Sequence, residues 1–245
     1  MSGPSPRGAP ILRLRGLAKS FGSVEVLRGV DLDMHEGVRH LLIGPNGAGK
    51  TTLFNLVNGG LAPTRGQIEF AGKDITRLSR HRRARAGLGR TFQVASLFPR
   101  LTVWDNLVLA AQAPGFLARR AGAARAKAAT ALELSGLAAR RQALAGALAY
   151  GQQRLLEIAM ALATEPRMLL LDEPMAGLTH EERTAFADRI VELSTTTAIL
   201  LIEHDLETAL RIAERVTVLN LGAVICDGTP EEVLADPLVK QVYLG

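Results

Sequence analysis

The sequence predicts an α/β fold with parallel strands at the centre of its sheet and a block of helices inserted between two halves of one core. Short apolar runs alternate with segments that carry helix-start signals, a pattern typical of strand–helix–strand units. Between about residues 101 and 163 the composition changes to Ala, Leu and Arg, which favours helix. Hydrophobic residues make up 47% of the 245 residues, so the chain can bury a core and is not a disordered protein.

The first part of the chain is expected to contain strands and turns. Residues 1–10, MSGPSPRGAP, have no apolar segment and are predicted to be a disordered tail, not a signal peptide. Apolar residues alternate from Ile11 to Leu14, and Val24 to Asp33 has an extended pattern. The run from Val38 to Ile43 is expected to be a buried strand.

A glycine-rich turn from Gly44 to Thr52 follows that buried strand. Leu53 to Val57 continues as a helix, which Asn58-Gly59-Gly60 ends. Two further strands are expected at Gln67 to Phe70 and at Leu88 to Gln93.

The helical block begins with a capping box at Thr102-Val103-Trp104-Asp105, and its helices resume near residue 118 after Pro114-Gly115. Helix starts are predicted from the cap residues Thr179, Asp205 and Thr229, the last followed by Pro230 and Glu232. Strands are expected at Met168–Leu171, Ala198–Ile202, Arg215–Asn220 and Ala223–Asp227.

The composition excludes several classes of protein. The single cysteine, Cys226, rules out an internal disulfide framework and a cysteine-based zinc cage, and is expected to be a small buried strand residue. No apolar stretch approaches the roughly 20 residues of a membrane span, and a cytoplasmic protein is therefore expected.

The net charge of +5 permits anionic partners without choosing among them. A basic run lies between the predicted strands Gln67–Phe70 and Leu88–Gln93 and has no interleaved aromatic residues. It is interpreted as a solvated helix face, in preference to a nucleic-acid patch, with contact to the inner membrane leaflet as a secondary option. The run comprises Arg77, Arg80, His81, Arg82, Arg83 and Arg85.

The glycine-rich turn matches the phosphate-binding pattern G-x-x-x-x-G-K-S/T at every fixed position. Glycines let successive N–H groups turn toward phosphate oxygens, and the following helix directs its positive dipole end at the same anion. Lys50 is expected to reach the β- and γ-phosphates, Thr51 to ligate Mg²⁺ and Thr52 to contact the α-phosphate. The predicted nucleotide cradle is Gly44, Pro45, Asn46, Gly47, Ala48, Gly49, Lys50, Thr51 and Thr52.

Two acids follow the apolar run Met168–Leu171. In an open α/β sheet, ligands bind at the carboxyl ends of the strands. Asp172 is therefore predicted to hold Mg²⁺, and Glu173 to polarise the attacking water. Together with the phosphate loop, this predicts a site for ATP and Mg²⁺.

Leu148-Ala149-Tyr150-Gly151-Gln152 and the helix after it resemble the signature motif of ABC-transporter ATPases, usually written LSGGQ. Arg90-Thr91-Phe92-Gln93 resembles the Q-loop of that family, Met175 to Thr179 its D-loop, and Ile202-Glu203-His204-Asp205 its switch-histidine segment. The strings RTFQ, LFPRLTVWDNL, LAYGQQR, EPMAGL, IEHDL and GTPEEVLADPLVKQVYLG are similar to the LivG-type branch, the ATPases of branched-chain amino acid importers.

The resemblance implies a P-loop (RecA-like) nucleotide-binding core with an antiparallel β subdomain and an inserted α-helical subdomain. Residues 11–245 would form a single ABC ATPase domain. Within it, residues 11–93 and 165–245 would be the core, and residues 94–164 the helical insertion carrying the signature.

The resemblance also implies roles for individual residues. Phe21 would stack on adenine, Gln93 would sense Mg²⁺ and the attacking water, and His204 would hydrogen-bond the γ-phosphate, acting with Glu173 in catalysis. The signature of one subunit would face the ATP of another, with a helix opening at Gln152. The residues so assigned are Leu148, Ala149, Tyr150, Gly151 and Gln152.

Two departures from the family pattern stand out. Ala149 and Tyr150 replace the usual Ser and Gly, which suggests a non-identical ATPase subunit as partner, although a homodimer could form in isolation. Thr179 replaces the Asp that usually ends the D-loop, and we interpret it as a helix cap completed by Glu182.

The function implied is ATP hydrolysis that drives an importer of branched-chain or other amino acids. Alternatives are a urea or amide importer, a lipid or lipopolysaccharide exporter, and, less favoured, a nucleic-acid-associated ABC ATPase. The implied partners are membrane permease subunits and, indirectly, an external solute-binding protein, with no nucleic acid. The chain would lie on the inner face of the plasma membrane through those permeases.

Overall fold

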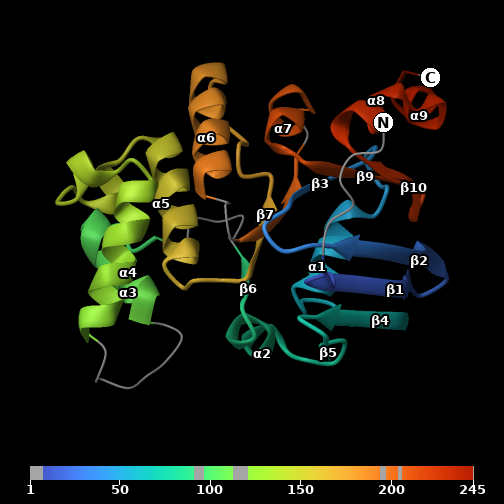
Figure 1. The fold of residues 1–245 in the computed structure, drawn as a ribbon, viewed down its shortest axis with the longest axis horizontal. Coiled ribbons are helices and arrows are strands. Elements are labelled where there is room, and N and C mark those ends of the chain that lie inside the picture. Colours follow the sequence, from blue (N-terminus) through green and yellow to red (C-terminus); the bar gives the residue numbers. More distant parts are fainter. Residues whose placement is uncertain (1–7, 91–96, 113–120, 194–196, 204–205, 245) are drawn as a thin grey trace.

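The computed structural model describes residues 8–90, 97–112, 121–193, 197–203 and 206–244 (Figure 1). Two sheets lie side by side, and a group of helices stands apart at the far end from the smaller sheet. Most of the predicted N-terminal tail lies outside the described residues. The arrangement is the α/β class that the sequence predicts.

The larger sheet has six strands in the order β10-β9-β3-β8-β7-β6. The five strands from β9 to β6 are parallel, and β10 runs antiparallel to β9 at one edge. Every residue of β7 and β8 is buried, because a parallel strand covered on both faces has no polar side. The bounds are β3 Arg39–Ile43, β6 Leu88–Arg90, β7 Met168–Asp172, β8 Ala198–Ile202, β9 Arg215–Asn220 and β10 Ala223–Gly228.

The smaller sheet is antiparallel, with four strands in the order β2-β1-β4-β5. Helix α1, Lys50–Val57, packs between the two sheets, and its apolar residues share one core with side chains of both. The bounds are β1 Leu12–Phe21, β2 Val24–Met34, β4 Arg65–Phe70 and β5 Lys73–Asp74. The sequence did not indicate β5.

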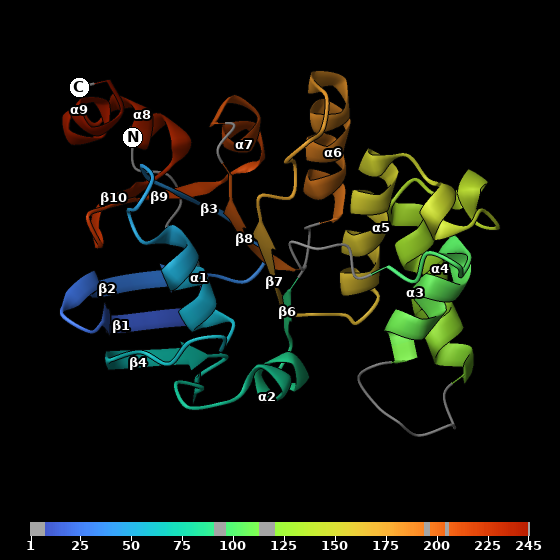
Figure 2. The ribbon, with the colours of Figure 1, turned by 180° about the vertical axis from the view of Figure 1, so that it is seen from behind.

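Four helices cover the other face of the six-stranded sheet, as seen from behind in Figure 2. They are α6 His180–Leu193, α7 Leu206–Ile212, α8 Pro230–Ala235 and α9 Pro237–Leu244. Their apolar residues form a second core with β3, β7, β8 and β9. The central strands of the six-stranded sheet are thus buried on both faces, while the edge strand β10 stays partly exposed.

The helical block forms a third core of its own. It contains α3 Val103–Gln112, α4 Ala121–Leu134 and α5 Tyr150–Leu162, with short 3-10 turns at Ala138–Arg140 and Ala145–Ala147. The predicted cap is confirmed, because the Asp105 N–H donates to Thr102 Oγ1 at 3.0 Å. The predicted start at Gln152 is wrong. Helix α5 begins at Tyr150, because extended Ala149 is its N-cap.

Two more predicted caps are confirmed by reciprocal hydrogen bonds. The Glu182 N–H donates to Thr179 Oγ1 at 3.2 Å, and the Thr179 N–H to Glu182 Oε2 at 2.9 Å, so α6 begins at His180. Thr229 and Glu232 form the same box ahead of α8. The third predicted cap, Asp205, lies outside the described residues.

Some predicted boundaries and exposures differ from the structure. Helix α1 begins at Lys50, within the glycine-rich stretch Gly44 to Thr52, because left-handed Gly49 serves as its N-cap. Strand β6 ends at Arg90, and the rest of its predicted span lies outside the described residues. Cys226 lies on β10 as predicted, but it is only partly buried, since β10 is an edge strand.

The interpretation of the basic run as a solvated face is wrong at Arg83. Helix α2, Arg80–Arg85, exposes the other basic residues, but Arg83 is only 1% exposed. Its guanidinium donates to the carbonyls of Leu56 and Val57 at 2.6 and 2.7 Å, and to those of Leu78 and Thr76 at 3.0 Å. The charge therefore lies at the C-terminal end of α1, where the helix dipole is negative.

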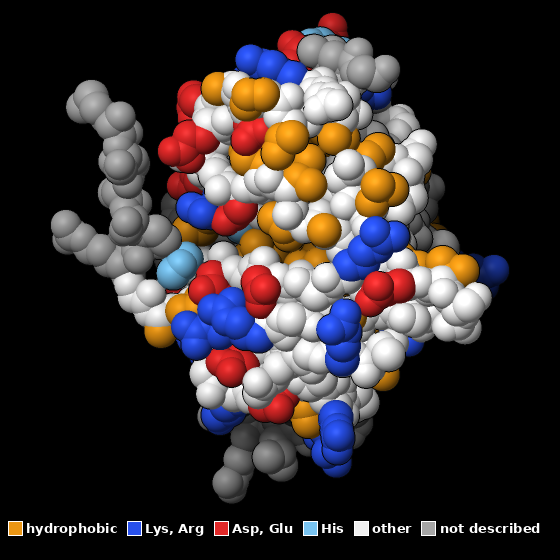
Figure 3. All heavy atoms as spheres, turned by 90° about the vertical axis from the view of Figure 1, so that its right-hand side faces the viewer, with side chains coloured by type: hydrophobic (Ala, Val, Ile, Leu, Met, Phe, Trp, Pro, Cys, Tyr) orange, Lys and Arg blue, Asp and Glu red, His pale blue; other side chains and the backbone are white. Residues whose placement is uncertain are grey.

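The end of the molecule opposite the helical block has a mixed surface (Figure 3). Hydrophobic side chains gather on its upper part, on the side of α8 and α9, while charges of both signs alternate below. Within the described parts of the chain, no helix combines the length and apolar character needed to cross a bilayer.

His40 on β3 is buried beside the neighbouring strand β9 and is expected to make folding stability depend on pH. Its Nε2 lies 2.6 Å from Thr217 Oγ1, which itself donates to Asp227 at 2.8 Å. Thr217 therefore accepts from Nε2–H, and Nδ1 is buried with no hydrogen-bond partner. Burial lowers the pKa of His40 to about 4; Asp227 opposes this shift, while Arg215 and His35 add to it.

Because the unfolded chain binds this proton near pH 6.5 and the folded chain only near pH 4, stability is retained above pH 6.5 and lost as the pH falls. At pH 5 the loss due to His40 is about 2 kcal/mol. Urea unfolding at pH 7.5 and 5.0 will measure it. His40→Leu should remove this part of the decrease, while His81→Gln, at an exposed histidine, should not. An equal acid decrease in His40→Leu and wild type would refute the assignment.

Candidate nucleotide-binding site

The loop between β3 and α1 has a backbone that only glycine can adopt at two points. Gly44 has φ +155°, and a Cβ there would lie 2.1 Å from the carbonyl oxygen of Leu219. Gly49 has φ +103°, and its Cβ would lie 2.7 Å from Leu27 Cδ2. Gly49 is the N-cap of α1 and offers no side-chain hydrogen bond. The first N–H groups of α1 therefore have no side-chain acceptor and remain available at the loop. Such an end is suited to an anion.

Lys50 folds back over this loop. Its Nζ donates to the carbonyl oxygens of Gly44 at 2.6 Å and Pro45 at 3.0 Å, and the residue is 7% exposed. Burial lowers the pKa of Lys50, and the charges of Glu173 and Asp172 partly offset this. The ammonium group thus lies in the loop and within the field of both acids.

The register of the sheet explains why the acids reach this loop. Leu42 on β3 is opposite Ile202 on β8, and Ile202 is opposite Asp172 on β7. With strands spaced about 4.8 Å apart, Asp172 lies about 10 Å across the sheet from Leu42. Parallel strands bring their carboxyl ends to one edge, so the loop and the acids meet there.

Asp172 and Glu173 differ in their surroundings. Asp172 ends β7 and is 8% exposed. Glu173 is half-buried and has φ +48°, one of four left-handed non-glycine residues among those described. Its N–H donates to the Ile202 carbonyl at 2.9 Å, which holds the turn against β8. Strained backbone of this kind is common at functional sites.

Oxygen ligands for a divalent cation are present at this edge. No group of three or more His, Cys, Asp or Glu that could hold a metal occurs within the described ranges. Mg²⁺, however, is bound in nucleotide sites by one or two protein oxygens together with phosphates and water. The carboxylate of Asp172 and the hydroxyl of exposed Thr51 at the start of α1 fit that requirement.

Two residues that support this site were missed by sequence reasoning. Glu203, 5% exposed, accepts from the Met175 N–H at 2.8 Å, so the acid beside His204 holds the predicted D-loop. Tyr243 on α9 lies beside the backbone of Gly44; burial raises the pKa of Tyr243 to about 12, and the Gly44 backbone partly opposes this shift. The only sequence signal was that Glu203 lies in the string IEHDL and Tyr243 in the string QVYLG, both of which resemble the LivG-type branch.

The signature residues lie at the start of α5 and contact the predicted D-loop of the same chain. The Ala149 N–H donates to Gln152 Oε1 at 3.3 Å, and Leu148 is buried. Among described residues, none of the five forms a hydrogen bond with the phosphate loop. The structure therefore does not bring these two predicted parts of the nucleotide site together within one chain.

Three residues assigned through the family resemblance have different outcomes. Phe21 ends β1 and is 48% exposed, with Lys19 Nζ 5.0 Å from its ring centroid. Its stacking on adenine stays a prediction. Gln93 and His204 lie outside the described residues, and their roles also stay predictions.

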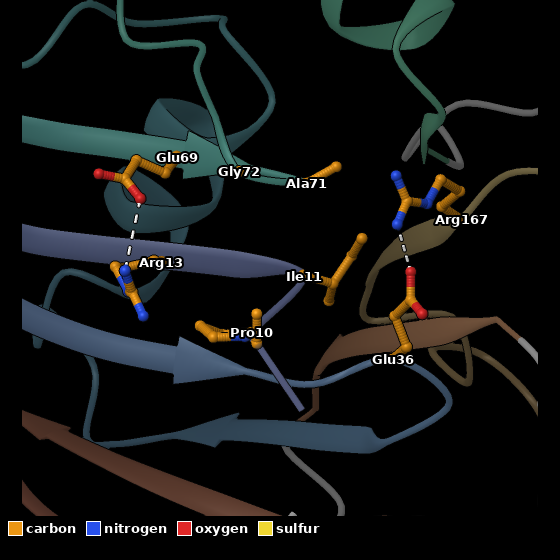
Figure 4. Close-up of a pocket in the computed structure, with 9 residues that line it drawn as sticks. Pro10, Ile11, Arg13, Glu36, Glu69, Ala71, Gly72 and Arg167 are labelled. Atoms are coloured by element: carbon orange, nitrogen blue, oxygen red, sulfur yellow. Dashed lines mark hydrogen bonds and ion pairs between the residues drawn. The ribbon is translucent and has the colours of Figure 1, made fainter. Parts of the chain in front are cut away.

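A hollow of about 360 Å³ lies away from this site (Figure 4). Arg13 and Glu69 pair on one side of it, and Arg167 and Glu36 on the other. Neither the phosphate loop nor the two acids line it. Its charged residues pair with one another across short distances, and it adds nothing to the nucleotide site.

A family model described as ABC transporter matches residues 27–176, more than half of the chain. The chain belongs to the ABC transporter family of ATP-binding proteins. A second model, described as branched-chain amino acid ATP-binding cassette transporter, matches residues 223–245. The family match confirms the resemblance to ABC-transporter ATPases that the sequence motifs indicated. The second model and the relatives of this ABC protein described next support the resemblance to the LivG-type branch.

Three similar proteins extend over nearly its whole length. BraF of Pseudomonas aeruginosa, a high-affinity branched-chain amino acid transport ATP-binding protein, is 41% identical over 96% of this chain and 98% of its own. LivG of Escherichia coli K12, with the same description, is 40% identical over the same shares. LptB of Haemophilus influenzae, a lipopolysaccharide export ATP-binding protein, is 38% identical over 96% and 97%.

Solved structures agree with the fold. The ADP conformation of an ATP-binding cassette of an ABC transporter has a TM-score of 0.85 and 32% identity, covering 97% of this chain and 100% of its own. A dimeric cassette bound to ADP and phosphate after hydrolysis has a TM-score of 0.75 and 25% identity, covering 89% and 98%. This ABC protein therefore has the P-loop fold and is an ATP-binding ATPase.

Proposed function

We propose that this ABC protein is the ATP-hydrolysing subunit of an importer for branched-chain or other amino acids. The observation that carries the proposal is the match of residues 223–245 to the branched-chain amino acid model. Those residues form β10, α8 and α9, and α9 contributes Tyr243 to the phosphate loop. The identity with BraF and LivG supports the same solute class.

In this proposal Gly44–Thr52 holds the phosphates of ATP. Lys50 exchanges its two carbonyl partners for phosphate oxygens, which are stronger acceptors because they are charged. The first turn of α1, which has no side-chain cap, adds N–H donors and the positive end of its dipole. Phe21, exposed at the end of β1, offers a flat apolar surface for adenine.

Glu173 acts as the general base that orients and deprotonates water. It follows the end of β7, and its left-handed backbone is held by the hydrogen bond to Ile202. Asp172 and Thr51, with Gln93, would hold Mg²⁺, which neutralises phosphate charge during transfer. Gln93 orients the water, and His204 donates to the γ-phosphate as charge develops.

A second ATPase subunit completes each site in this proposal. Leu148 to Gln152 presents the start of α5 to ATP held by the partner, and Ala149 brings no hydroxyl to it. A partner with its own signature is therefore favoured over an identical copy. Membrane permease subunits transmit the motion, and a solute-binding protein outside the cell delivers the solute. The chain then lies on the inner face of the plasma membrane through the permeases.

A second candidate is export of lipopolysaccharide, which the identity with LptB favours. A urea or amide importer is a third outcome of the same test. The experiment is to purify the intact membrane complex through a tag on this chain and reconstitute it in vesicles. ATP hydrolysis is then measured with leucine, isoleucine or valine and the solute-binding protein, with urea, and with lipopolysaccharide.

We expect the branched-chain amino acids to raise the ATPase rate and to accumulate on the side of this subunit. The same complex carrying Glu173→Gln measures the background rate of ATP hydrolysis that does not come from this subunit. Stimulation by lipopolysaccharide or urea alone would overturn the amino-acid proposal while leaving the ATPase assignment intact.

A further inference from the structure

Tyr150 occupies a signature position where the family pattern has glycine, and its ring is held rigidly. It is the first residue of α5 and is 48% exposed. Its hydroxyl accepts from Arg154 Nε at 3.1 Å and Nη2 at 2.8 Å, and the guanidinium carbon lies 5.2 Å from the ring centroid. Arg154 Nη1 in turn donates to Glu157 at 2.8 Å. An exposed aromatic residue is thus restrained by Arg154, which Glu157 holds in turn.

The restrained ring lies against Gly177 of the predicted D-loop, Met175–Thr179. A Cβ on Gly177 would lie 3.0 Å from Tyr150 Cε1, with Cζ and the hydroxyl oxygen at 3.6 and 3.7 Å. Gly177 has φ +79°, so a side chain there would be strained as well as crowded. The ring therefore contacts Gly177, the one residue of the segment that has no side chain, although Gly177 itself remains exposed.

The next signature residue contacts the other end of the same segment. A Cβ on Gly151 would lie 3.0 Å from Glu182 Oε1 and 3.3 Å from Leu178 Cδ2. Glu182 is already fixed by its capping box with Thr179. Two consecutive residues of α5 thus pack along the segment that connects Glu173 to α6.

The start of that segment is also held from the side of Glu173. The Ala176 N–H donates to the Glu173 carbonyl at 3.2 Å, and the Met175 N–H to Glu203 at 2.8 Å. A displacement at Gly177 would therefore be transmitted over one turn of backbone to Glu173. Small displacements at a reacting centre reduce rate steeply.

We propose that Tyr150 is a positioning residue, whose ring holds the Met175–Thr179 segment against α5 so that Glu173 and the signature keep one relative geometry. The proposal rests on the proposed roles of Glu173 and the signature. Arg154 and Glu157 fix the rotamer of the ring in advance, which lowers the entropy lost on ordering the segment. At the position where the family pattern has glycine, Tyr150 therefore acts by packing against the Met175–Thr179 segment and not by contacting phosphate.

The test is a double-mutant cycle in the full chain assembled with its membrane subunits. Tyr150→Ala removes the ring and keeps a good helix former, and should lower kcat about tenfold with the KM for ATP within about twofold of wild type. Gly177→Ala should lower kcat about 100-fold, because its Cβ displaces the ring and its backbone is strained. Since Tyr150→Ala removes the crowding, the double variant should be clearly faster than the product of the two single effects.

Two further variants sharpen the readout. Tyr150→Phe keeps the ring on Gly177 but loses both bonds from Arg154, and should fall between wild type and Tyr150→Ala. Gly136→Ala is the matched control: Gly136 has φ +70° and follows α4, and the atoms nearest to a Cβ there belong to the flexible end of Arg189. The kcat of the Gly136→Ala/Tyr150→Ala double variant should equal the value expected from the product of the two single effects.

Independent effects of Tyr150→Ala and Gly177→Ala would overturn the proposal. An effect of Tyr150→Ala on KM alone would also overturn it, because such an effect indicates a contact with the nucleotide. A loss of activity that is explained by a lower urea midpoint would overturn it as well, because it indicates a structural role. A negative result here leaves the solute test untouched. Failure of the Glu173 assignment would instead be seen as undiminished hydrolysis by Glu173→Gln.

Discussion

Glu173→Gln should reduce ATP hydrolysis by at least about 100-fold, because a positioned general base contributes roughly 10²- to 10⁴-fold to such reactions. The amide has nearly the same size as the carboxylate and tolerates the same left-handed backbone, so the turn held by Ile202 should remain. Lys50 and the phosphate loop are unchanged, and ATP binding should be retained. Phosphate release in a single-turnover experiment measures the first effect, and equilibrium binding of Mg-ATP the second.

Matched variants distinguish loss of the base from loss of binding. Glu181→Gln, an exposed acid in the first turn of α6, should hydrolyse ATP at the wild-type rate. Lys50→Ala should lose affinity for ATP itself, since it removes the charge within the loop. If the base is lost and binding is kept, ATP should also hold Glu173→Gln in a stable dimer on size-exclusion chromatography. Wild-type turnover by Glu173→Gln would remove Glu173 from the mechanism.

Arg83→Met should lower the free energy of unfolding by about 3–5 kcal/mol, the range seen when one partner of a buried charged network is removed. Methionine fills part of the space but cannot donate, so the carbonyls of Leu56, Val57, Leu78 and Thr76 are left buried without this donor. Burial lowers the pKa of Arg83, yet the group stays charged, with Asp74 favouring the charge. Urea unfolding at pH 7.5 measures the loss.

The control lies beside it on the same helix. Arg82 is exposed, so Arg82→Met should change stability by no more than about 0.5 kcal/mol. Arg83→Lys should lie between the two, because an ammonium group keeps the charge but cannot reach all four carbonyls. Equal stability of Arg83→Met and Arg82→Met would show that the network contributes nothing to folding.

Local patterns of the sequence were sufficient for most elements of this fold. Thr102, Thr179 and Thr229 cap the helices that their spacing predicted, because a cap depends on residues three positions apart. The buried runs at β7 and β8 were recognisable because a strand covered on both faces is apolar throughout. Boundaries shifted where the backbone conformation of one residue decided them, as at Gly49 and Ala149.

Interactions between distant segments could not be predicted in this way. Arg83 looks like its exposed neighbours, and only the approach of α1 to α2 supplies the carbonyls that bury it. Glu203 and Tyr243 gave no local signal, since their partners Met175 and Gly44 lie far away in the sequence.

By itself the sequence determined the chemistry: a phosphate loop, two acids after a buried strand, and a signature that indicates an ABC ATPase. These are decided by residue type and short spacing, which the chain carries wherever it is folded. The tertiary structure alone decided which groups meet. The parallel register places Asp172 at the same sheet edge as Lys50, and the packing of α5 on the segment after Glu173 places Tyr150 against Gly177. Such contacts depend on the relative position of whole elements, which no short stretch of sequence encodes.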